Sequence, residues 1–263
     1  MIDSICVVDN NSNDNFDTDF DKNKIKYIKN KENKGYSDGN NVGLKYLVNT
    51  EKCDICFIAN PDVIFEENTL KEIIDAMEKN EKIVVASSRR YGPNNAIIHQ
   101  YFDFPDIKTS IKNCFYFPRK KFEKNRHIVQ NDKVNNTKNN LIVDAVPGSF
   151  FAIKSSFLKK NDFLYDGIFM YGEEIILGRQ VSNAGYCSAI VTSVSYIHNH
   201  KQERFSNKKM FKMDRESLKI YYKMFEKYKW YQILLLNIAC FIGNLEYSCA
   251  FYIYHIVKHE RKK

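Results

Sequence analysis

The chain has 263 residues, of which 44% are hydrophobic and 27% are charged. These fractions are typical of a soluble globular protein with one large domain or two small ones, and they exclude a disordered or collagen-like chain. The seven cysteines are odd in number and widely spread, so we expect free thiols and not a disulfide framework. Cys53 and Cys56 lack a second metal-binding pair, which disfavours a metal or redox site there.

The net charge of +8 comes from the last quarter of the chain. Residues 201–263 contain 14 lysines and arginines against 6 acidic residues, whereas residues 1–200 contain 26 of each. No base-reading or base-stacking motif accompanies this charge, so a nucleic acid partner is not expected. Lysines beside long apolar stretches favour attraction to an anionic membrane surface instead.

The first half of the chain predicts alternating strands and helices. The first residues hold an acidic Asp3 and only a short apolar run, so no signal peptide is expected. Short apolar runs predict buried strands at residues 5–8, 25–28, 53–59 and 83–86. Helical spacing of apolar residues predicts helices around 44–48 and 69–77, the second with a capping box of Thr69 and Glu72. This order implies an α/β domain with a largely parallel sheet.

Polar residues follow two of these strands. Asp9 and Asn10 end the first strand, and Asp62 ends the third. Ligands of α/β sheets bind beyond the carboxyl ends of the strands, although a single such residue is more often a turn former or helix cap. Two strands that end in carboxylates, with an Asn- and Gly-rich helix entry at 33–43 between them, favour a nucleotide site.

Six segments resemble family 2 glycosyltransferases, which have the GT-A fold. VVDNNSND (7–14), NKGYSDGNNVGL (33–44) and NPD (60–62) resemble the nucleotide-binding half of that family. VPGSFFAIK (146–154), FMYGEEIILGRQ (169–180) and IHNH (197–200) resemble its acceptor half, in the same order. The similarity covers residues 1–205 and is closest to the rhamnosyltransferase-like branch that builds bacterial surface polysaccharides. It implies a mixed, mostly parallel sheet flanked by helices.

The resemblance assigns the nucleotide to the strand ends and to the glycine-rich segment. Asp9 would contact the base, since a carboxylate can accept the imide N–H of uracil or thymine. Glycines there permit close approach of the backbone, and a helix start favours a diphosphate. The residues implied for nucleotide binding are Asp9, Asn11, Asn33, Gly35, Asn41 and Asn60.

The NPD triplet stands where the family has its D-x-D metal motif. Asp62 would bind the cation that bridges the diphosphate, and Asn60 replaces the first carboxylate. Oxygen ligands and a diphosphate suit Mg²⁺ or Mn²⁺. His198 matches a family histidine near the metal or the diphosphate, with His200 as the alternative ligand. An acidic turn without metal and a structural histidine are the alternatives.

The Glu173-Glu174 pair stands where the family has its catalytic base. The resemblance assigns the base to Glu174, the second of the two, although adjacent carboxylates at a helix start could instead be a capping pair. Gly148 and Ser149 match the loop beside the sugar and acceptor. Arg179 matches a family arginine that would hold the helix or a phosphate.

The chain departs from the family at its start and in its middle. Family members begin one strand and one helix earlier, so we expect one wall of the donor site to be missing, through truncation, supply by another chain or a short variant. Residues 132–140 predict a polar loop. The aromatic residues before it could stack on sugars or form an ordinary core: Tyr101, Phe102, Phe104, Phe115, Tyr116 and Phe117.

Residues 206–263 predict a basic and aromatic helical extension. Residues 208–231 favour an amphipathic helix, and residues 233–257 favour two helices broken near Gly243. A membrane span is disfavoured because Glu246 would lie near its centre.

The sequence thus indicates an inverting, metal-dependent glycosyltransferase, peripheral on the cytoplasmic face of a bacterial membrane. Its partners would be a UDP- or dTDP-sugar donor, a glycan or lipid-linked glycan acceptor, an anionic membrane surface and, in a homo-oligomer, further copies of itself. The alternative is a truncated or non-catalytic glycosyltransferase-like subunit that needs a partner chain. A nucleotidyltransferase is disfavoured because the chain lacks a basic phosphate-binding signature.

Overall fold

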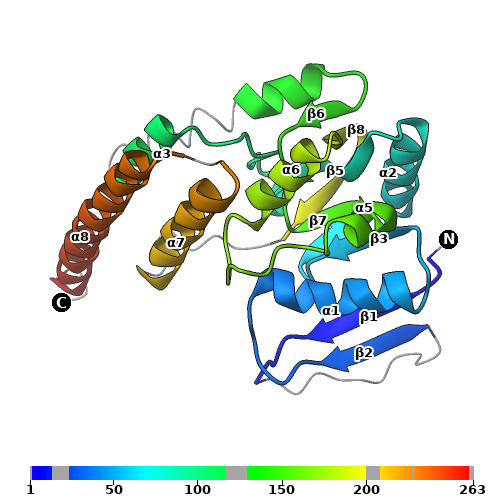
Figure 1. Cartoon of the computed structure of the whole chain (residues 1–263), viewed down its shortest axis with the longest axis horizontal. Coiled ribbons are helices and arrows are strands. Elements are labelled where there is room, and N and C mark those ends of the chain that lie inside the picture. The colour runs from blue at the N-terminus through cyan, green and yellow to red at the C-terminus, as the bar shows by residue number, and fades with distance from the viewer. Residues whose placement is uncertain (1, 14–23, 116–128, 200–207, 227, 261–263) are drawn as a thin grey trace.

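The computed structural model describes residues 2–13, 24–115, 129–199, 208–226 and 228–260 (Figure 1). The side chains of residues 208–211 and 253–260 are not described. Tyr116, Phe117 and His200, which the sequence analysis named, lie outside the described residues, as does the predicted boundary at 205.

The main sheet has six strands in the order β3-β7-β5-β8-β4, with β6 also paired to β8. These strands are β3 (Ile55–Ala59), β4 (Val63–Phe65), β5 (Ile83–Tyr91), β6 (Leu141–Val143), β7 (Phe150–Lys154) and β8 (Cys187–His198). The strands β1 (Ile5–Asp9) and β2 (Ile25–Lys29) form a separate parallel pair beside it. All four strands predicted from apolar runs are present.

The sheet is mixed, as expected, but the expectation of mostly parallel pairing is wrong. Among the described strands only β1–β2 and β5–β8 pair in parallel, whereas β3–β7, β5–β7, β4–β8 and β6–β8 are antiparallel. The alternation of strands and helices concerns neighbours in sequence. It gives no information about β7, which inserts antiparallel between β3 and β5 from about sixty residues further along the chain.

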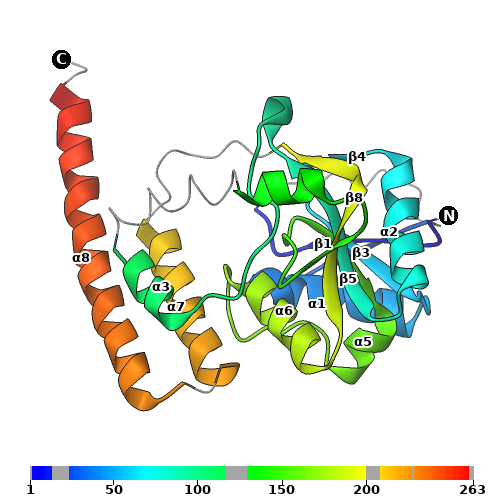
Figure 2. The same cartoon turned by 90° about the horizontal axis from the view of Figure 1, so that it is seen from above.

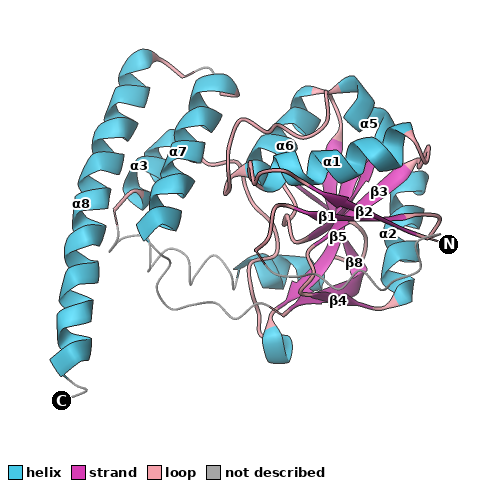
Figure 3. Ribbon diagram, turned by 90° about the horizontal axis from the view of Figure 1, so that it is seen from below, coloured by secondary structure: helices cyan, strands magenta, loops and turns pink. Residues whose placement is uncertain are grey.

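Four of the labelled helices flank the strands (Figure 3). They are α1 (Tyr36–Asn49), α2 (Glu67–Lys79), α5 (Ser155–Lys160) and α6 (Glu173–Asn183), and a short 3-10 turn, η1 (Pro93–Asn95), follows β5. Helix α2 buries Leu70, Ile73 and Met77 in one core with the inner strands. It begins at Glu67, so the predicted capping box is wrong: Thr69 lies inside the first turn, and its hydroxyl donates to the carbonyl of Ser195.

A second group of helices stands beside the sheet domain (Figures 1 and 2). It consists of α3 (Ile107–Asn113), α7 (Lys208–Met224) and α8 (Trp230–Glu260), with α8 outermost. The core between them contains Cys114, Tyr222, Leu236 and Cys240. Helix α3 comes from the middle of the chain, so this helical unit is not formed by the C-terminal segment alone.

Helix α8 runs unbroken for 31 residues, and the predicted break near Gly243 is wrong. A Cβ added at Gly243 would lie 1.9 Å from the carbonyl oxygen of Cys114. Glycine in a helix costs about 1 kcal/mol relative to alanine. Here it lets α8 approach the backbone at the end of α3.

Residues 129–136 are helical, although the sequence predicted a polar loop from Asp132 onward. The side chain of Gln130 is buried and donates to the carbonyl of Tyr101, which anchors the segment to the sheet domain. Tyr101 is itself buried in the main core, so its aromatic ring has the ordinary structural role.

Candidate active site

Asp9 lies at the end of β1 as a rigidly held carboxylate. Its Oδ1 accepts a hydrogen bond from the backbone N–H of Ser12 at 2.7 Å, and its Oδ2 accepts one from the Tyr27 hydroxyl at 2.9 Å. The Lys29 ammonium lies 3.4 Å away. The Ser12 hydrogen bond is the main reason that the pKa of Asp9 is lowered to about 2. Asp9 is therefore ionised at neutral pH.

Asn10 organises the loops next to Asp9. Its amide nitrogen donates to Asn33 Oδ1 and to the carbonyl of Gly35, both at 3.0 Å, and its Oδ1 accepts from the Asn30 amide. Asn11 follows as an exposed residue with a positive φ of 62°, a conformation that asparagine tolerates. The sequence placed Asn10 only as a strand-end residue, and its role in joining the loop after β1 to the loop between β2 and α1 depends on contacts that no local pattern shows.

Gly35 joins this loop to the segment that precedes α6. It has a φ of +115°, and a Cβ at this position would lie 2.2 Å from the carbonyl oxygen of Phe169. The N–H of Tyr36 donates to the same carbonyl at 2.9 Å. A larger residue at position 35 would push the two segments apart. The two halves of the resemblance therefore meet at this contact.

The Glu173-Glu174 pair opens α6 and faces the Gly148 loop. The N–H of Gly148 donates to Glu174 Oε1 at 3.3 Å, and the Tyr36 hydroxyl donates to the Gly148 carbonyl. Gly172 occupies the cap position of α6, where no side chain forms a capping hydrogen bond. The pair borders a small cavity lined by Tyr36, Ser37, Val146, Gly148, Phe151, Leu164, Tyr165, Glu173, Glu174 and Leu177.

Burial raises the pKa of both of these carboxyl groups above its ordinary value. Removal from water, and then the neighbouring Glu174 charge, raise the pKa of Glu173 to about 8. Removal from water also raises the pKa of Glu174, against the opposing effect of N–H donors and of Arg90. Glu173 Oε2 is buried without a hydrogen-bond partner among the described residues. A raised pKa beside a cavity suits a group that exchanges a proton near neutral pH.

Asp62 and His198 come together because β4 and β8 are antiparallel neighbours. The pairing places Val63 opposite His198, and His198 Nε2 lies 3.2 Å from Asp62 Oδ1. Arg90, near the end of β5, places its Nη2 2.7 Å from His198 Nδ1. A guanidinium can only donate, so Nδ1 is the acceptor and Nε2 carries the hydrogen that faces Asp62.

Arg90 is a site residue that the sequence analysis missed. It contacts His198, and its charge lowers the pKa of Glu174 and of Tyr196, so it acts on both the Asp62 turn and the Glu173-Glu174 pair. The available signal was the Arg89-Arg90 pair, which follows the predicted strand at 83–86 toward its carboxyl end.

The Asp62 turn fits a cation that a diphosphate completes. No group of three or more His, Cys, Asp or Glu side chains within the described ranges could hold a metal by itself. Mg²⁺ commonly takes one or two carboxylates and completes its shell with water and substrate phosphates. Asp62 fits this role, while His198, with its Nε2 hydrogen toward Asp62, orients that carboxylate.

Asn60 and Ser149 connect the Asp62 turn to the Gly148 loop. The N–H of Asn60 donates to the Ser149 carbonyl at 2.9 Å. The Ser149 hydroxyl lies 2.9 Å from the Tyr196 hydroxyl, and both residues are buried. The proposed metal turn and the proposed acceptor loop are thus parts of one hydrogen-bonded structure.

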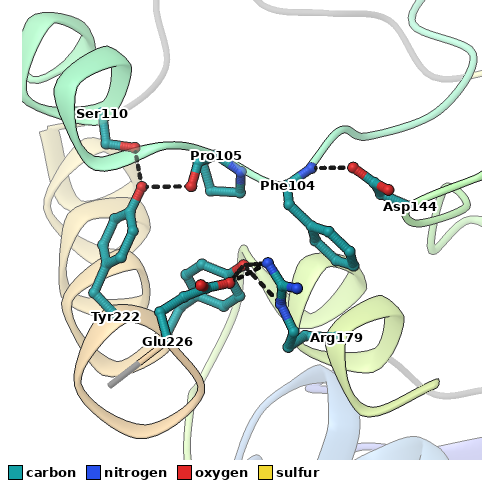
Figure 4. A network of polar contacts seen from close by, with 8 residues as sticks. Phe104, Pro105, Ser110, Asp144, Arg179, Tyr222 and Glu226 are labelled. Carbon is teal, nitrogen blue, oxygen red and sulfur yellow. Dashed lines mark hydrogen bonds and ion pairs between the residues drawn. The ribbon is translucent and has the colours of Figure 1, made fainter. Parts of the chain in front are cut away.

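Asn41 and Arg179 have contacts of another kind. Asn41 is buried, and its amide pairs with the backbone N–H and carbonyl of Leu164, so it fastens α1 to the loop before α6. Arg179 pairs with Glu226 and donates to the Tyr221 hydroxyl at 3.2 Å, both on the α7 side (Figure 4). Its guanidinium also lies 3.7 Å from the centre of the Phe104 ring. Of its two expected roles, the structure shows the one that holds helices together.

The mixed sheet flanked by helices is typical of the GT-A class of fold. A solved structure of this class, titled "Crystal structure of GalNAc-T7 with UDP, GalNAc and Mn2+", superposes with a TM-score of 0.57 over 86% of the chain, at 12% sequence identity. The chain spans 43% of the length of that protein. The expected GT-A fold is confirmed.

The family follows from the sequence match. The model described as "Glycosyl transferase family 2" matches residues 2–159, which is more than half of the chain. The chain therefore belongs to glycosyl transferase family 2. None of the curated proteins matches it in sequence.

Proposed function

We propose that the chain transfers a sugar from a UDP- or dTDP-sugar to a bacterial surface glycan, with inversion at the anomeric carbon. The observation that carries this proposal is the position of Glu174. Its carboxylate borders the cavity and accepts a hydrogen bond from the Gly148 N–H. The contact between Gly35 and Phe169 holds the proposed donor loop against the segment that precedes Glu174.

The donor would lie along the Asp9 and Asn33 loops. Ionised Asp9 accepts the imide N–H of uracil or thymine, and cytosine has no such donor. The N-terminus of α1, which follows Gly35, would direct the positive end of its dipole toward the diphosphate, although the Tyr36 N–H is already donated to the Phe169 carbonyl. Asn41 has no part in this proposed donor site because its amide is used by Leu164.

Asp62 would hold Mg²⁺ or Mn²⁺ against the diphosphate. When bound, the cation supplies neutralisation of the charge on the departing nucleoside diphosphate. Asn60 keeps the turn in place through Ser149, and Arg90 with His198 fixes the direction of the Asp62 carboxylate.

Glu174 would remove the proton of the acceptor hydroxyl. The hydroxyl oxygen forms a bond to the anomeric carbon as the bond from that carbon to the diphosphate oxygen breaks, and the proton passes to Glu174. Because the attack is opposite to the leaving group, a single displacement inverts the configuration. The raised pKa of Glu174 makes its ionised form a stronger base, which favours transfer of this proton to it.

The acceptor is proposed to be a capsule, O-antigen or similar glycan, as in the rhamnosyltransferase-like branch that the motifs resemble. Work at the cytoplasmic face of the membrane is supported by the excess of basic residues in 201–263. Among the described residues, the Trp230–Tyr252 part of α8 is long and apolar enough to cross a membrane by length and composition.

Thermal unfolding with Mn²⁺ and a panel of UDP, dTDP, GDP and CDP tests the donor site. A ligand at about 100 times its Kd adds about 2.7 kcal/mol to the free energy of unfolding. We expect a metal-dependent stabilisation by UDP or dTDP, lost in Asp62→Ala and kept in Asp132→Ala, whose aspartate is exposed outside the site. A folded protein that no nucleotide stabilises would contradict the proposal.

A further inference from the structure

Helix α8 presents a long apolar face to solvent. The exposed large side chains repeat at helical spacing along it: Trp230, Tyr231, Leu234, Leu235, Ile238, Phe241, Ile242, Leu245 and Tyr252. Trp230, Phe241 and Tyr252 are 76%, 66% and 70% exposed. At 1.5 Å per residue this outer face extends over about 34 Å. An apolar surface of this length on a water-soluble protein marks an interaction site.

The opposite face of α8 is already occupied. Leu236, Ala239, Cys240 and Tyr247 are buried, and Gly243 approaches the backbone of Cys114. The helix is thus apolar on both sides, of which only one is covered by the protein. A helix that is apolar all round is found in a protein core or in contact with lipid.

Charge favours a lipid surface over a second copy of the chain. Residues 201–263 carry a net charge of +8, and Lys212, Lys223 and Lys229 are exposed. Two copies joined through α8 would bring two segments of net charge +8 together, whereas an anionic bilayer attracts those basic groups that lie near its surface, by about 1 kcal/mol each. The exposed rings of Trp230, Tyr231 and Tyr252 are amphipathic side chains of the kind that prefers the headgroup level of a bilayer.

The packing of α8 opposes a membrane crossing. Its inner face contacts α3 and α7, and α7 carries the exposed residues Lys212, Glu216 and Lys223. A crossing α8 that kept these contacts would carry those charges into hydrocarbon, which is costly for each one. A helix lying in the plane of the interface leaves α3 and α7 on the water side.

We propose that the outer face of α8 docks in the plane of an anionic bilayer. The docked unit is tied to the candidate base: the Ser217 hydroxyl on α7 donates to the carbonyl of Met170, and Arg179 on α6 pairs with Glu226. Docking therefore holds the loop before Glu174 near the lipid. If the proposed function is correct, the acceptor is a lipid-linked glycan presented from that surface.

Flotation with vesicles tests the docking directly. The probes are vesicles of phosphatidylcholine alone and of phosphatidylcholine with phosphatidylglycerol. The test variant is Ile238→Glu/Phe241→Glu. The control is Ile97→Glu/Ile142→Glu. It adds the same charge at two isoleucines that are also about half exposed but lie outside the helical unit. Melting temperature and stabilisation by Mn²⁺ with UDP are measured for each protein to confirm folding and to follow the donor site separately.

We expect the wild type and the control to bind the anionic vesicles, to dissociate in high salt or alkaline carbonate, and to bind the neutral vesicles at least tenfold more weakly. The Ile238→Glu/Phe241→Glu variant should lose at least tenfold in binding while it remains folded. Resistance to carbonate would overturn in-plane docking in favour of a span. A dimer that this variant splits, with no vesicle binding by the wild type, would overturn it in favour of a second copy. Vesicle binding without stabilisation by Mn²⁺ and UDP would refute only the proposed function. Stabilisation by Mn²⁺ and UDP without vesicle binding would refute only the docking.

Discussion

The buried Glu173 makes the stability of the protein depend on pH in a defined direction. Its pKa of about 8 in the folded protein lies above the ordinary 4.5. Between these two values the folded state keeps a proton that the unfolded state has released. The free energy of unfolding therefore falls as the pH rises through this window, and the loss is complete above pH 8.

Glu173→Gln should remove this loss. At about 1.4 kcal/mol for each pH unit between the two pKa values, the ionised side chain costs on the order of 3 to 5 kcal/mol at pH 8. Glutamine has the same shape and no charge. We expect the variant to be more stable than the wild type by about this amount at pH 8 and by almost nothing at pH 4.5.

Urea unfolding at several pH values between 4.5 and 8.5 measures the effect. Glu67→Gln is the matched control, since Glu67 is the first residue of α2 as Glu173 is of α6, but is exposed. The control should follow the wild type across the range. Parallel profiles for Glu173→Gln and the wild type would show that Glu173 is not held in the low-dielectric site described here.

Three further changes test the site and the helical unit. Glu174→Gln should lower sugar transfer by about 10²- to 10⁴-fold while stabilisation by Mn²⁺ with UDP is kept, and full activity would remove Glu174 as the base. Gly243→Ala should lower the free energy of unfolding in urea by about 1 to 3 kcal/mol, because the added methyl group meets the Cys114 carbonyl. A gain of about 1 kcal/mol, which is the helix-propensity effect alone, would show that α8 does not pack there. Glu226→Gln should lower the free energy of unfolding by about 2 to 4 kcal/mol, because it leaves the largely buried Arg179 without its ionic partner. The double variant Arg179→Met/Glu226→Gln should recover part of that loss. A Glu226→Gln variant as stable as the wild type would contradict the pairing.

Local patterns predicted the elements that depend on neighbouring residues. The apolar runs of β1, β2, β3 and β5 are each followed by turn formers, and α2 has its buried side chains at helical spacing. Family-like segments placed Glu174 and Gly148 in separate parts of the sequence, and the structure brings them into hydrogen-bond contact. The strands, helix α2 and the family-like segments are each encoded within about ten neighbouring residues, whereas the contact between Gly148 and Glu174 is not.

The features that the sequence did not predict depend on distant partners. The break expected at Gly243 does not occur, and the glycine instead serves a close approach to the carbonyl of Cys114, which is 129 residues away in the sequence. Asn41 is part of a glycine-rich helix entry, yet its amide is taken by the backbone of Leu164. The Arg89-Arg90 pair after the predicted strand at 83–86 does not by itself indicate a function, and the role of Arg90 follows from its contact with His198.

The origin of α3 has a practical consequence for work on this protein. Helix α3 is encoded between β5 and β6, but its buried side is covered by α7 and α8 (Figure 2). A chain shortened to end after β8 would expose Ile107 and Cys114 and would leave Arg179 without Glu226. Shortening the C-terminus to improve solubility should therefore promote aggregation. A usable short form requires that residues 107–115 be replaced or given a polar surface at the same time.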